Sequence, residues 1–452
     1  MAEVFLVGGA VRDMLMGIKP KDFDFVVVGS SPIEMEALGF QKVGADFPVF
    51  LHPTTGDEFA LARTERKTAE GHAGFDCEWE GVTLEEDLSR RDLTINAMAV
   101  QCNGFDPSAM WVQDVKHDFK KWPLQVEDDP FGQEVIDPFG GVSDIENKVL
   151  RHTSEAFAED PLRVLRLARF LARFGEGWHP AADTMVLIQD MINQGMLTEL
   201  TPERVWKEVS RALMEPRPDA FFKFLWLMDA NIIPELDRLF FVPQRKDFHP
   251  EGDAGIHTML CLQAASAMNL TLEERFAVLC HDLGKFPAWE INSAKGKNNL
   301  GNHEVLGLDL VDAVCERWKV PNDCKTLARL VTKDHTNIHN LKNLRPNTIA
   351  KMFERWDLIR HPERALQIMN CCTADGRGRG PDHENDTHPS VDILPHFVAA
   401  WLQKVDVDAI QAERKEKGRP LLTGQHIGAR VRKERLERLT EVKKALKTLD
   451  TE

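Results

Sequence analysis

The spacing of apolar residues changes near residue 160 of this 452-residue chain. Before that point, short apolar runs such as residues 4–7 and 23–28 stand between glycine-containing and charged stretches, a pattern typical of strands in an α/β fold. After it, apolar residues recur at every third or fourth position, and residues 160–175 and 201–214 have the spacing of amphipathic helices. We therefore expect an α/β amino-terminal part followed by an all-helical remainder.

The composition excludes several classes of protein. No apolar run approaches the roughly 18 residues that a membrane-spanning helix needs, and residues 1–10 lack the basic start of a secretory signal. The eight cysteines include no C-x-x-C pair, which favours reduced thiols in the cytoplasm over a disulfide framework. The chain contains no tyrosine, so a tyrosine nucleophile is excluded. A formal net charge of −16 argues against nonspecific coating of nucleic acid but leaves room for a local basic groove.

Glycines and carboxylates near the amino terminus form a candidate catalytic set. Gly8 and Gly9 follow the first predicted strand, so bare backbone could approach a phosphate there. Alternation along the second strand places Asp22 and Asp24 on one face, where they repel each other unless cations such as Mg²⁺ neutralise them. Glu58, at the head of the third strand (57–63), is a candidate third carboxylate. Together these features predict metal-assisted nucleotidyl transfer; the alternative for the paired acids is a solvated strand end.

The chain resembles the class II tRNA nucleotidyltransferases, the CCA-adding enzymes, in their bacterial form with a carboxy-terminal HD domain. The matching motifs run in the family's order and cover nearly the whole length. They are GGAVRD (8–13), KDFDFVVVG (21–29), LARTERK (61–67), DLSRRDLTINAMA (87–99), IDPFGG (136–141), EDPLRVLRLARF (159–170) and TPERVWKE (201–208).

The resemblance implies a fold and a division into domains. The fold is an α/β nucleotidyltransferase head, a mixed sheet with flanking helices, followed by all-α neck, body, HD and tail regions. The implied boundaries are a head at 1–150 with an inserted loop at 103–133, a neck at 151–215 with the nucleotide-selecting helix, a body at 216–250, an HD-like domain at 251–345 and a helical basic tail at 346–452.

The implied activity is addition of CCA to tRNA 3′ ends from CTP and ATP, without a nucleic-acid template and with release of pyrophosphate. Asp22 and Asp24 would hold Mg²⁺, with Glu58 beside them. A poly(A) polymerase of the same superfamily is the alternative, and a catalytically idle RNA-binding or HD hydrolase protein is a third hypothesis. A monomer and a homodimer both remain open.

Two motifs would bind the nucleotide's phosphates. The resemblance places Gly9 and Arg12 against the triphosphate, with Arg91 also binding nucleotide. The alternative for Arg91 is a salt bridge to its neighbour Asp92.

Nucleotide selection is assigned by the resemblance to an E-D-x-x-R motif, matched here by Glu159, Asp160 and Arg163. Cytosine and adenine both present an exocyclic amino donor beside a ring-nitrogen acceptor, whereas uracil and guanine present the reverse. An accepting carboxylate with a donating guanidinium therefore accommodates C and A, because a mismatch leaves buried polar groups unpaired. The structural alternative is that Asp160, before Pro161, caps the next helix.

Arginines form one stripe along the same predicted helix, and like charges at this spacing repel unless anions face them. We expect nucleotide phosphates to be those anions, so that Arg166 and Arg169 also bind nucleotide. Glu203 and Glu208 on the following helix are the structural alternative. The stripe consists of Arg163, Arg166, Arg169 and Arg173.

Histidines and aspartates in the second half resemble an HD-type metal phosphohydrolase, in which they bind a divalent metal that activates water. A second divalent transition metal such as Ni²⁺ would suit these ligands. The implied metal set is His257, His281, Asp282, His303 and Asp334.

The last element of this set departs from the family pattern. His335 is followed by Thr336 where close relatives carry an acid, and Asp334 lies two positions earlier, turned by about 200° around a helix. Phosphatase or 2′,3′-cyclic phosphodiesterase activity and a purely structural helical domain are both open.

The carboxy-terminal segment is basic. Residues 414–447 contain 12 lysines and arginines but only four acidic residues. A solvated helix face and an RNA-facing tail are the two interpretations.

Overall fold

The structure is a computed structural model that describes residues 2–43, 49–54, 56–67, 75–102, 134–297 and 299–449. The predicted insertion at 103–133 lies outside these residues. The chain divides into two compact units, Met1–Thr201 with Met228–Ala230 and Pro202–Leu227 with Asn231–Glu452. The finer division into five domains stays a prediction.

The first unit is built around a mixed sheet with the strand order β3-β4-β5-β2-β1-β8-β9. Strands β2 and β5 run parallel, whereas the other neighbours are antiparallel. The three strands predicted from the sequence appear as β1, β2 and β5. The strands are β1 (Glu3–Val7), β2 (Asp24–Val28), β3 (Gln41–Val43), β4 (Val49–Leu51), β5 (Glu58–Leu61), β8 (Ala99–Gln101) and β9 (Val135–Ile136).

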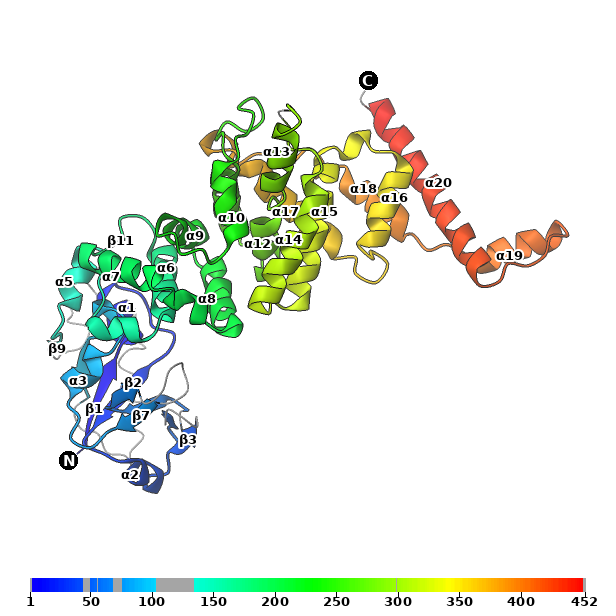
Figure 1. The fold of residues 1–452 in the computed structure, drawn as a ribbon. Coiled ribbons are helices and arrows are strands. Elements are labelled where there is room, and N and C mark those ends of the chain that lie inside the picture. The colour runs from blue at the N-terminus through cyan, green and yellow to red at the C-terminus, as the bar shows by residue number, and fades with distance from the viewer. Residues whose placement is uncertain are drawn as a thin grey trace. The chain divides into compact units, whose positions relative to one another are not determined.

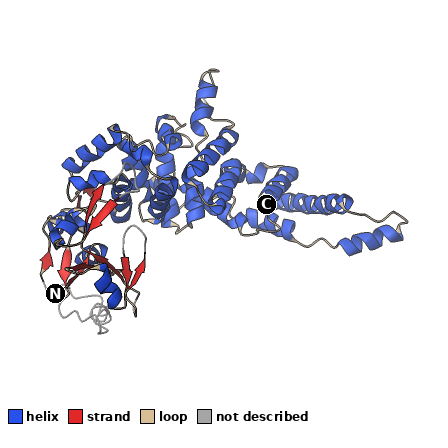
Figure 2. Cartoon of the chain, turned by 60° about the horizontal axis from the view of Figure 1, so that its bottom comes forward, coloured by secondary structure: helices blue, strands red, loops and turns tan. Residues whose placement is uncertain are grey.

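Helices and short ladders complete this unit, which holds the described strands (red in Figure 2). The helices are α1 (Gly9–Leu15), α2 (Pro32–Ala37), α3 (Leu84–Ser89), α5 (Gly141–Glu146), α6 (Leu162–Phe174) and α7 (Ala182–Asn193), with 3-10 turns η1 (Thr94–Asn96), η3 (Glu155–Glu159) and η4 (Met196–Glu199). The ladders are β6 (Thr64–Lys67) with β7 (Phe75–Glu78) and β10 (Val149–Leu150) with β11 (His179–Pro180).

Both faces of the central strands are covered by apolar side chains. Leu6 of β1 belongs to one buried cluster and its neighbour Phe5 to another, as strand alternation requires. Across β2 and β5 the rings of Phe25 and Phe59 stack with centroids 4.6 Å apart. This packing fixes the end of the sheet where β2 begins with Asp24.

The second unit is helical, as the sequence predicts. Helix α8 begins at Pro202, and α12 packs against α11, α15 and α17 (Figure 1). The helices are α8 (Pro202–Met214), α9 (Pro218–Leu227), α10 (Pro234–Asp237), α11 (Ala254–Ala267), α12 (Leu272–Cys280), α13 (Lys285–Ser293), α14 (His303–Trp318), α15 (Asn322–His339), α16 (Pro346–Arg355), α17 (Arg364–Arg377), α18 (Leu394–Leu402), α19 (Val407–Glu416) and α20 (Gln425–Leu449), with 3-10 turns η5 (Arg238–Phe241), η6 (Leu341–Asn343) and η7 (Pro381–His383). Across the ranges described above, no helix is both long and apolar enough to cross a bilayer.

Helix α20 carries much of the basic segment. It packs against α16 and α18 and buries Leu439 completely. Some of its basic side chains form ion pairs with acidic side chains. Arg432 contacts Glu354 at 2.6 Å, and Arg438 contacts Glu434 at 2.8 Å. These pairs fit a solvated helix face, and an RNA-facing role stays a prediction.

Candidate active sites

A cavity of about 360 Å³ opens in the first unit at the end of the sheet where β1 stops and β2 begins. Phe170 of α6 and Asn96 of η1 complete its wall. Six of its lining residues belong to the predicted nucleotide and metal set: Gly9, Arg12, Asp24, Arg91, Arg163 and Arg166.

Strand register explains why the glycine turn meets the carboxylates. Val7 of β1 pairs with Asp24 of β2, so Gly8 follows directly beside it. On the other side, Asp24 pairs with Glu58 of β5. Gly8 has φ +71°, and a Cβ at this position would lie 2.8 Å from Nη1 of Arg91. Glycine is therefore required both by the backbone conformation and by the close approach of Arg91.

The three predicted carboxylates interact electrostatically. Asp22 and Glu58 are exposed, and Asp22 lies just before β2 rather than within it. Asp24 is exposed as well. Desolvation by the surrounding protein still raises its pKa, the Arg91 guanidinium opposes this, and the negative charges of Glu58 and Asp22 raise it further. A cluster of mutually repelling acids at a cavity fits a divalent cation. The oxygens of Asp22, Asp24 and Glu58 do not already lie close together as a metal site. Among the described residues, the groups of three or more possible metal ligands within 4.8 Å of one another all lie in the second unit.

Arg12 is held rigidly at the cavity. Its Nε and Nη2 donate to Oδ1 of Asp13 at 2.9 and 2.6 Å, and its Nη1 donates to Oδ1 of Asn96. Asp13 also accepts from Arg173 at 2.8 Å. The Arg12 side chain is only 3% exposed, so its guanidinium is preorganised beside the predicted triphosphate site.

The alternative suggested for Arg91 names the wrong partner. Arg91 contacts Asp87 at 3.5 Å and the carbonyl of Asn96 at 3.5 Å. Asp92 instead accepts from Arg166 at 2.7–2.8 Å and from Nδ2 of Asn96 at 2.9 Å. Burial alone would raise the pKa of Asp92, but Arg166 and Asn96 bring it well below its usual range.

The start of helix α6 shows structural roles for the selection motif. Oδ1 of Asp160 accepts the N–H of Leu162 at 3.1 Å, which supports the capping alternative, although the helix itself begins at Leu162. Arg163 donates to the carbonyls of Ala156 and Arg90, each at 2.6 Å. Glu159 is exposed in η3. Of the three motif residues Arg163 lines the cavity, and both Arg163 and Asp160 are engaged by protein groups.

The arginine stripe on α6 faces carboxylates that the sequence analysis had not proposed. Arg166 pairs with Asp92 and Arg173 pairs with Asp13. Arg169 is buried and lies 4.9 Å from the centre of the Phe170 ring. Protein acids therefore supply part of the negative charge that we had expected from nucleotide phosphates.

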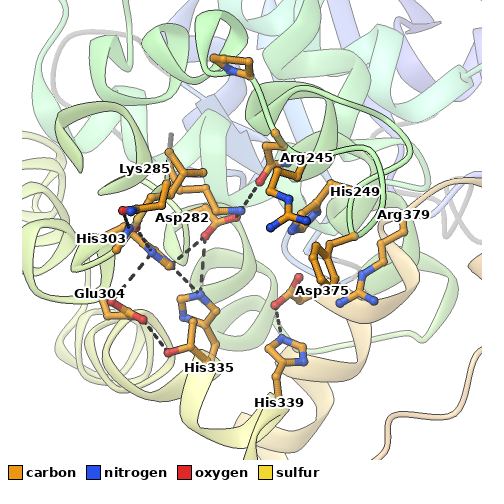
Figure 3. A pocket seen from close by; sticks show the side chains of 17 residues that line it. Arg245, His249, Asp282, Lys285, His303, Glu304, His335, His339, Asp375 and Arg379 are labelled. Atoms are coloured by element: carbon orange, nitrogen blue, oxygen red, sulfur yellow. Dashed lines mark hydrogen bonds and ion pairs between the residues drawn. The ribbon is translucent and has the colours of Figure 1, made fainter. Parts of the chain in front are cut away.

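A second cavity, of about 520 Å³, lies in the helical unit (Figure 3). His281 and Asp282 follow α12, His303 begins α14, and His335 lies on α15. Gly284 allows this meeting, because a Cβ there would lie 2.0 Å from the carbonyl of His303. The segment after α12 therefore packs closely against α14. This contact brings His281 and Asp282 close to His303.

Three histidines have their tautomers fixed by main-chain carbonyls. Nδ1 of His281, His303 and His335 lies 2.7, 2.8 and 3.1 Å from the carbonyls of residues 278, 300 and 331. Because a carbonyl only accepts, Nδ1 carries a proton in each ring, and Nε2 is the nitrogen left to present a lone pair to a metal.

These lone pairs converge on Asp282. Nε2 of His281 lies 3.1 Å from Oδ2 of Asp282, and Nε2 of both His303 and His335 lies 3.6 Å from Oδ1. The Nε2 atoms of His303 and His335 are only 3.1 Å apart. Burial and the nearby His303 lower the pKa of His335 to about 3, so the His335 ring itself is neutral near pH 7. Two Nε2 atoms this close to each other and to a buried carboxylate fit a divalent metal.

Asp375 of α17 completes this cluster and was missed by the sequence analysis. Its Oδ1 lies 3.0 Å from Nε2 of His257 and 3.9 Å from Nε2 of His281. On the far side, Nδ1 of His257 contacts Glu251 at 2.7 Å. The available signal was weak: an acidic residue directly before Gly376, following the mostly apolar residues 368–374.

The prediction that Asp334 is a metal ligand is wrong. Asp334 is fully buried, but its carboxylate accepts from Arg355 at 2.7 and 3.0 Å, from Nε1 of Trp356 at 2.8 Å and from Asn337 at 3.0 Å. These hydrogen bonds engage both carboxylate oxygens of Asp334, on the side of α15 that faces away from His303 and Asp282. Its neighbour His335 takes the position in the cluster, and Thr336 donates to Glu304 at 2.7 Å instead of binding a metal.

Two family models match the chain: a poly A polymerase head domain over residues 4–151 and an HD domain over residues 255–370. The multifunctional CCA protein of Ralstonia nicotianae is 45% identical over 413 residues, covering 90% of this chain and 89% of its own length. That of Acinetobacter baumannii strain SDF is 44% identical over 448 residues, covering 98% of both chains.

Solved structures share the fold at lower sequence identity. A CCA-adding enzyme in an apo form aligns with a TM-score of 0.59 and 20% identity, covering 100% of this chain and 92% of that one. The complex of a CCA-adding enzyme with ATP aligns with a TM-score of 0.59 and 18% identity, covering 99% and 92%.

Proposed function

The chain belongs to the family of multifunctional CCA proteins, and on that premise we propose that it adds CCA to the 3′ ends of tRNA. The reaction uses CTP and ATP without a nucleic-acid template and releases pyrophosphate. The observation that carries the proposal is the register that sets Gly8, Asp24 and Glu58 side by side at a cavity lined by arginines.

In this proposal the tRNA 3′-hydroxyl attacks the α-phosphate of the nucleotide. Asp22 and Asp24 would hold Mg²⁺, assisted by Glu58, and bound Mg²⁺ stabilises charge on the reacting phosphate. Arg12, fixed by Asp13 and Asn96, orients the triphosphate. Arg91, next to Gly8, would neutralise negative charge on the triphosphate. Gly9 has no side chain and so leaves space for the phosphates.

Base selection is proposed for the start of α6. Asp160 offers acceptor oxygens and Arg163 offers donors, the pattern that suits cytosine and adenine. In the structure these groups bind the N–H of Leu162 and the carbonyls of residues 90 and 156. Reading a base would therefore exchange protein contacts for base contacts, with Arg166 and Arg169 supporting the bound nucleotide.

The decisive experiment uses tRNA that ends at its discriminator base. CTP, ATP, UTP and GTP are supplied separately and together, and products are resolved by length. We expect two C additions with CTP, one further A when ATP is also present, and rejection of UTP and GTP. Long tracts of A from ATP alone would instead identify a poly(A) polymerase, and no incorporation under any condition would contradict the proposal.

Replacement of Gly8 by Ala is expected to lower kcat/KM for CTP incorporation at least about 10-fold, because the new Cβ displaces Arg91. Gly17→Ala is the matched control: Gly17 has the same φ of +71° but open space around its Cβ position. Gly8 also has ψ −129°, so its substitution carries more backbone strain than the roughly 1–2 kcal/mol of a left-handed helical position. Thermal unfolding should therefore show a larger loss for Gly8→Ala than for Gly17→Ala, and at a temperature where both variants are folded only Gly8→Ala should lose activity. Equal activity in both variants would argue against a role for Arg91.

A second activity is proposed for the helical unit. The converging His303 and His335 nitrogens beside Asp282 support a metal-dependent phosphohydrolase, acting as a phosphatase or a 2′,3′-cyclic phosphodiesterase. The imidazole-rich ligand set suits a transition metal such as Ni²⁺ better than Mg²⁺. Lys285, whose Nζ lies 2.6 Å from Asp282, adds positive charge for a phosphate.

A further inference from the structure

Behind Asp375, two histidines continue away from the proposed metal cluster in a single line of hydrogen bonds. We propose that His388 is a positioning residue: through His339, it fixes which oxygen of Asp375 faces the metal. The inference deepens the proposed phosphohydrolase site and rests on it. His388 comes from the segment between η7 and α18, and it is 4% exposed.

The first step is the orientation of His388 itself. The main-chain N–H of Ser390 donates to Nδ1 of His388 at 3.0 Å. A main-chain amide can only donate, so Nδ1 is an acceptor and the proton of the neutral ring resides on Nε2. Burial, together with the nearby His339, lowers the pKa of His388 to about 4, so the ring is neutral near pH 7. The Oγ of Ser390 donates to the carbonyl of Ile338 at 2.6 Å and holds the segment against α15.

The second step transfers this direction to His339. Nε2 of His388 lies 2.9 Å from Nδ1 of His339. Since His388 supplies the proton of this bond, Nδ1 of His339 must accept it, and the His339 proton lies on Nε2. That nitrogen is 2.6 Å from Oδ2 of Asp375. A fixed amide of the main chain thus determines the tautomer of two successive rings.

The third step is the effect on Asp375. Oδ2 is occupied by His339, which leaves Oδ1 facing His257 at 3.0 Å and His281 at 3.9 Å. Asp375 therefore presents one defined oxygen to the cluster. His339 lines the cavity together with Asp375, as Figure 3 shows. Groups that orient a ligand in this way typically change metal affinity or activity by about 10–100-fold when they are removed.

Two substitutions separate positioning from simple packing. In His388→Gln, the side-chain amide nitrogen can occupy the place of Nε2 and still donate to His339. In His388→Asn, the shorter side chain reaches only the place of Nδ1, so the donor is lost. We expect His388→Asn to weaken Ni²⁺ binding, measured by calorimetry, about 10–100-fold. We expect His388→Gln to stay within a few-fold of the wild type.

Three further readouts complete the test. Nitrogen-15 spectra of the Zn²⁺-loaded protein should show His339 protonated on Nε2 in the wild type and in His388→Gln, but not in His388→Asn. Hydrolysis of a 2′,3′-cyclic nucleotide should fall in kcat more than it rises in KM for His388→Asn. CTP incorporation and thermal unfolding should be similar in both variants, which reports that they fold.

Equal metal affinity in the Gln and Asn variants, or an unchanged His339 tautomer in His388→Asn, would overturn the inference. If the wild type hydrolyses no phosphoester, the proposed phosphohydrolase function fails. The metal titration and the tautomer still decide the role of His388 in that case.

Discussion

Replacement of Asp24 by Asn is expected to lower nucleotide incorporation by about 10³-fold or more. Asp24 stands between the glycine turn and Glu58, where desolvation by the surrounding protein and neighbouring acids raise its pKa. Neutralising it removes the central ligand for a divalent cation, and loss of about 4 kcal/mol of transition-state stabilisation corresponds to about 10³-fold in rate. The fold should be unaffected or slightly more stable, because one of three repelling charges is removed.

The measurement is single-turnover addition of C to tRNA that lacks its CCA end, across a range of Mg²⁺ concentrations. Glu36→Gln is the control, since Glu36 is an exposed acid on α2 of the same unit. Glu58→Gln should fall between the two. Full incorporation by the Asp24 variant at ordinary Mg²⁺ would remove the basis of the proposed mechanism.

Replacement of His303 by Gln is expected to abolish divalent metal binding in the second unit while CCA addition continues. His303 supplies one of two Nε2 lone pairs that meet 3.1 Å apart beside Asp282. Without it the transition metal loses an imidazole ligand, and hydrolysis should fall at least about 10²-fold. Asp282→Asn should have the same effect on metal binding. It should also destabilise the protein by about 3–5 kcal/mol, because buried Lys285 then keeps its bond to Gln244 but loses its anionic partner.

Calorimetric titration with Ni²⁺ and a phosphatase assay test this prediction on the same preparations. His396→Gln is the matched control, because His396 is exposed on α18. An undiminished metal affinity in His303→Gln would show that the opposed nitrogens are not a metal site. A simultaneous loss of CCA addition would show that the variant disturbs more than this cavity.

Local features were predictable from the sequence, because they depend on neighbouring residues. The apolar run before Gly8 and the periodicity that ends at Gly175 correctly predicted β1 and α6, and Gly175 ends α6 with φ +73°. The proximity of Gly8, Asp24 and Glu58 also follows from strand ends meeting at one edge of a sheet. Their roles in catalysis stay predictions.

Contacts between distant segments were not predictable in the same way. Asp375 joins His257 and Asp282 only because α11, α12, α15 and α17 pack together, and no spacing in the sequence encodes that. The choice between Asp334 and His335 depends on the rotation of α15, where adjacent residues point about 100° apart. The error for Arg91 has a related cause: the partner of Asp92 is Arg166 of α6, which is 74 residues away in the sequence.

Main-chain carbonyls, and not neighbouring side chains, orient Nδ1 of His281, His303 and His335. Residues that line the cavity, such as Arg245 or Phe248, could therefore be substituted without changing the orientation of these histidines. Such substitutions would change which phosphoesters the proposed site admits, while its nitrogens keep their orientation.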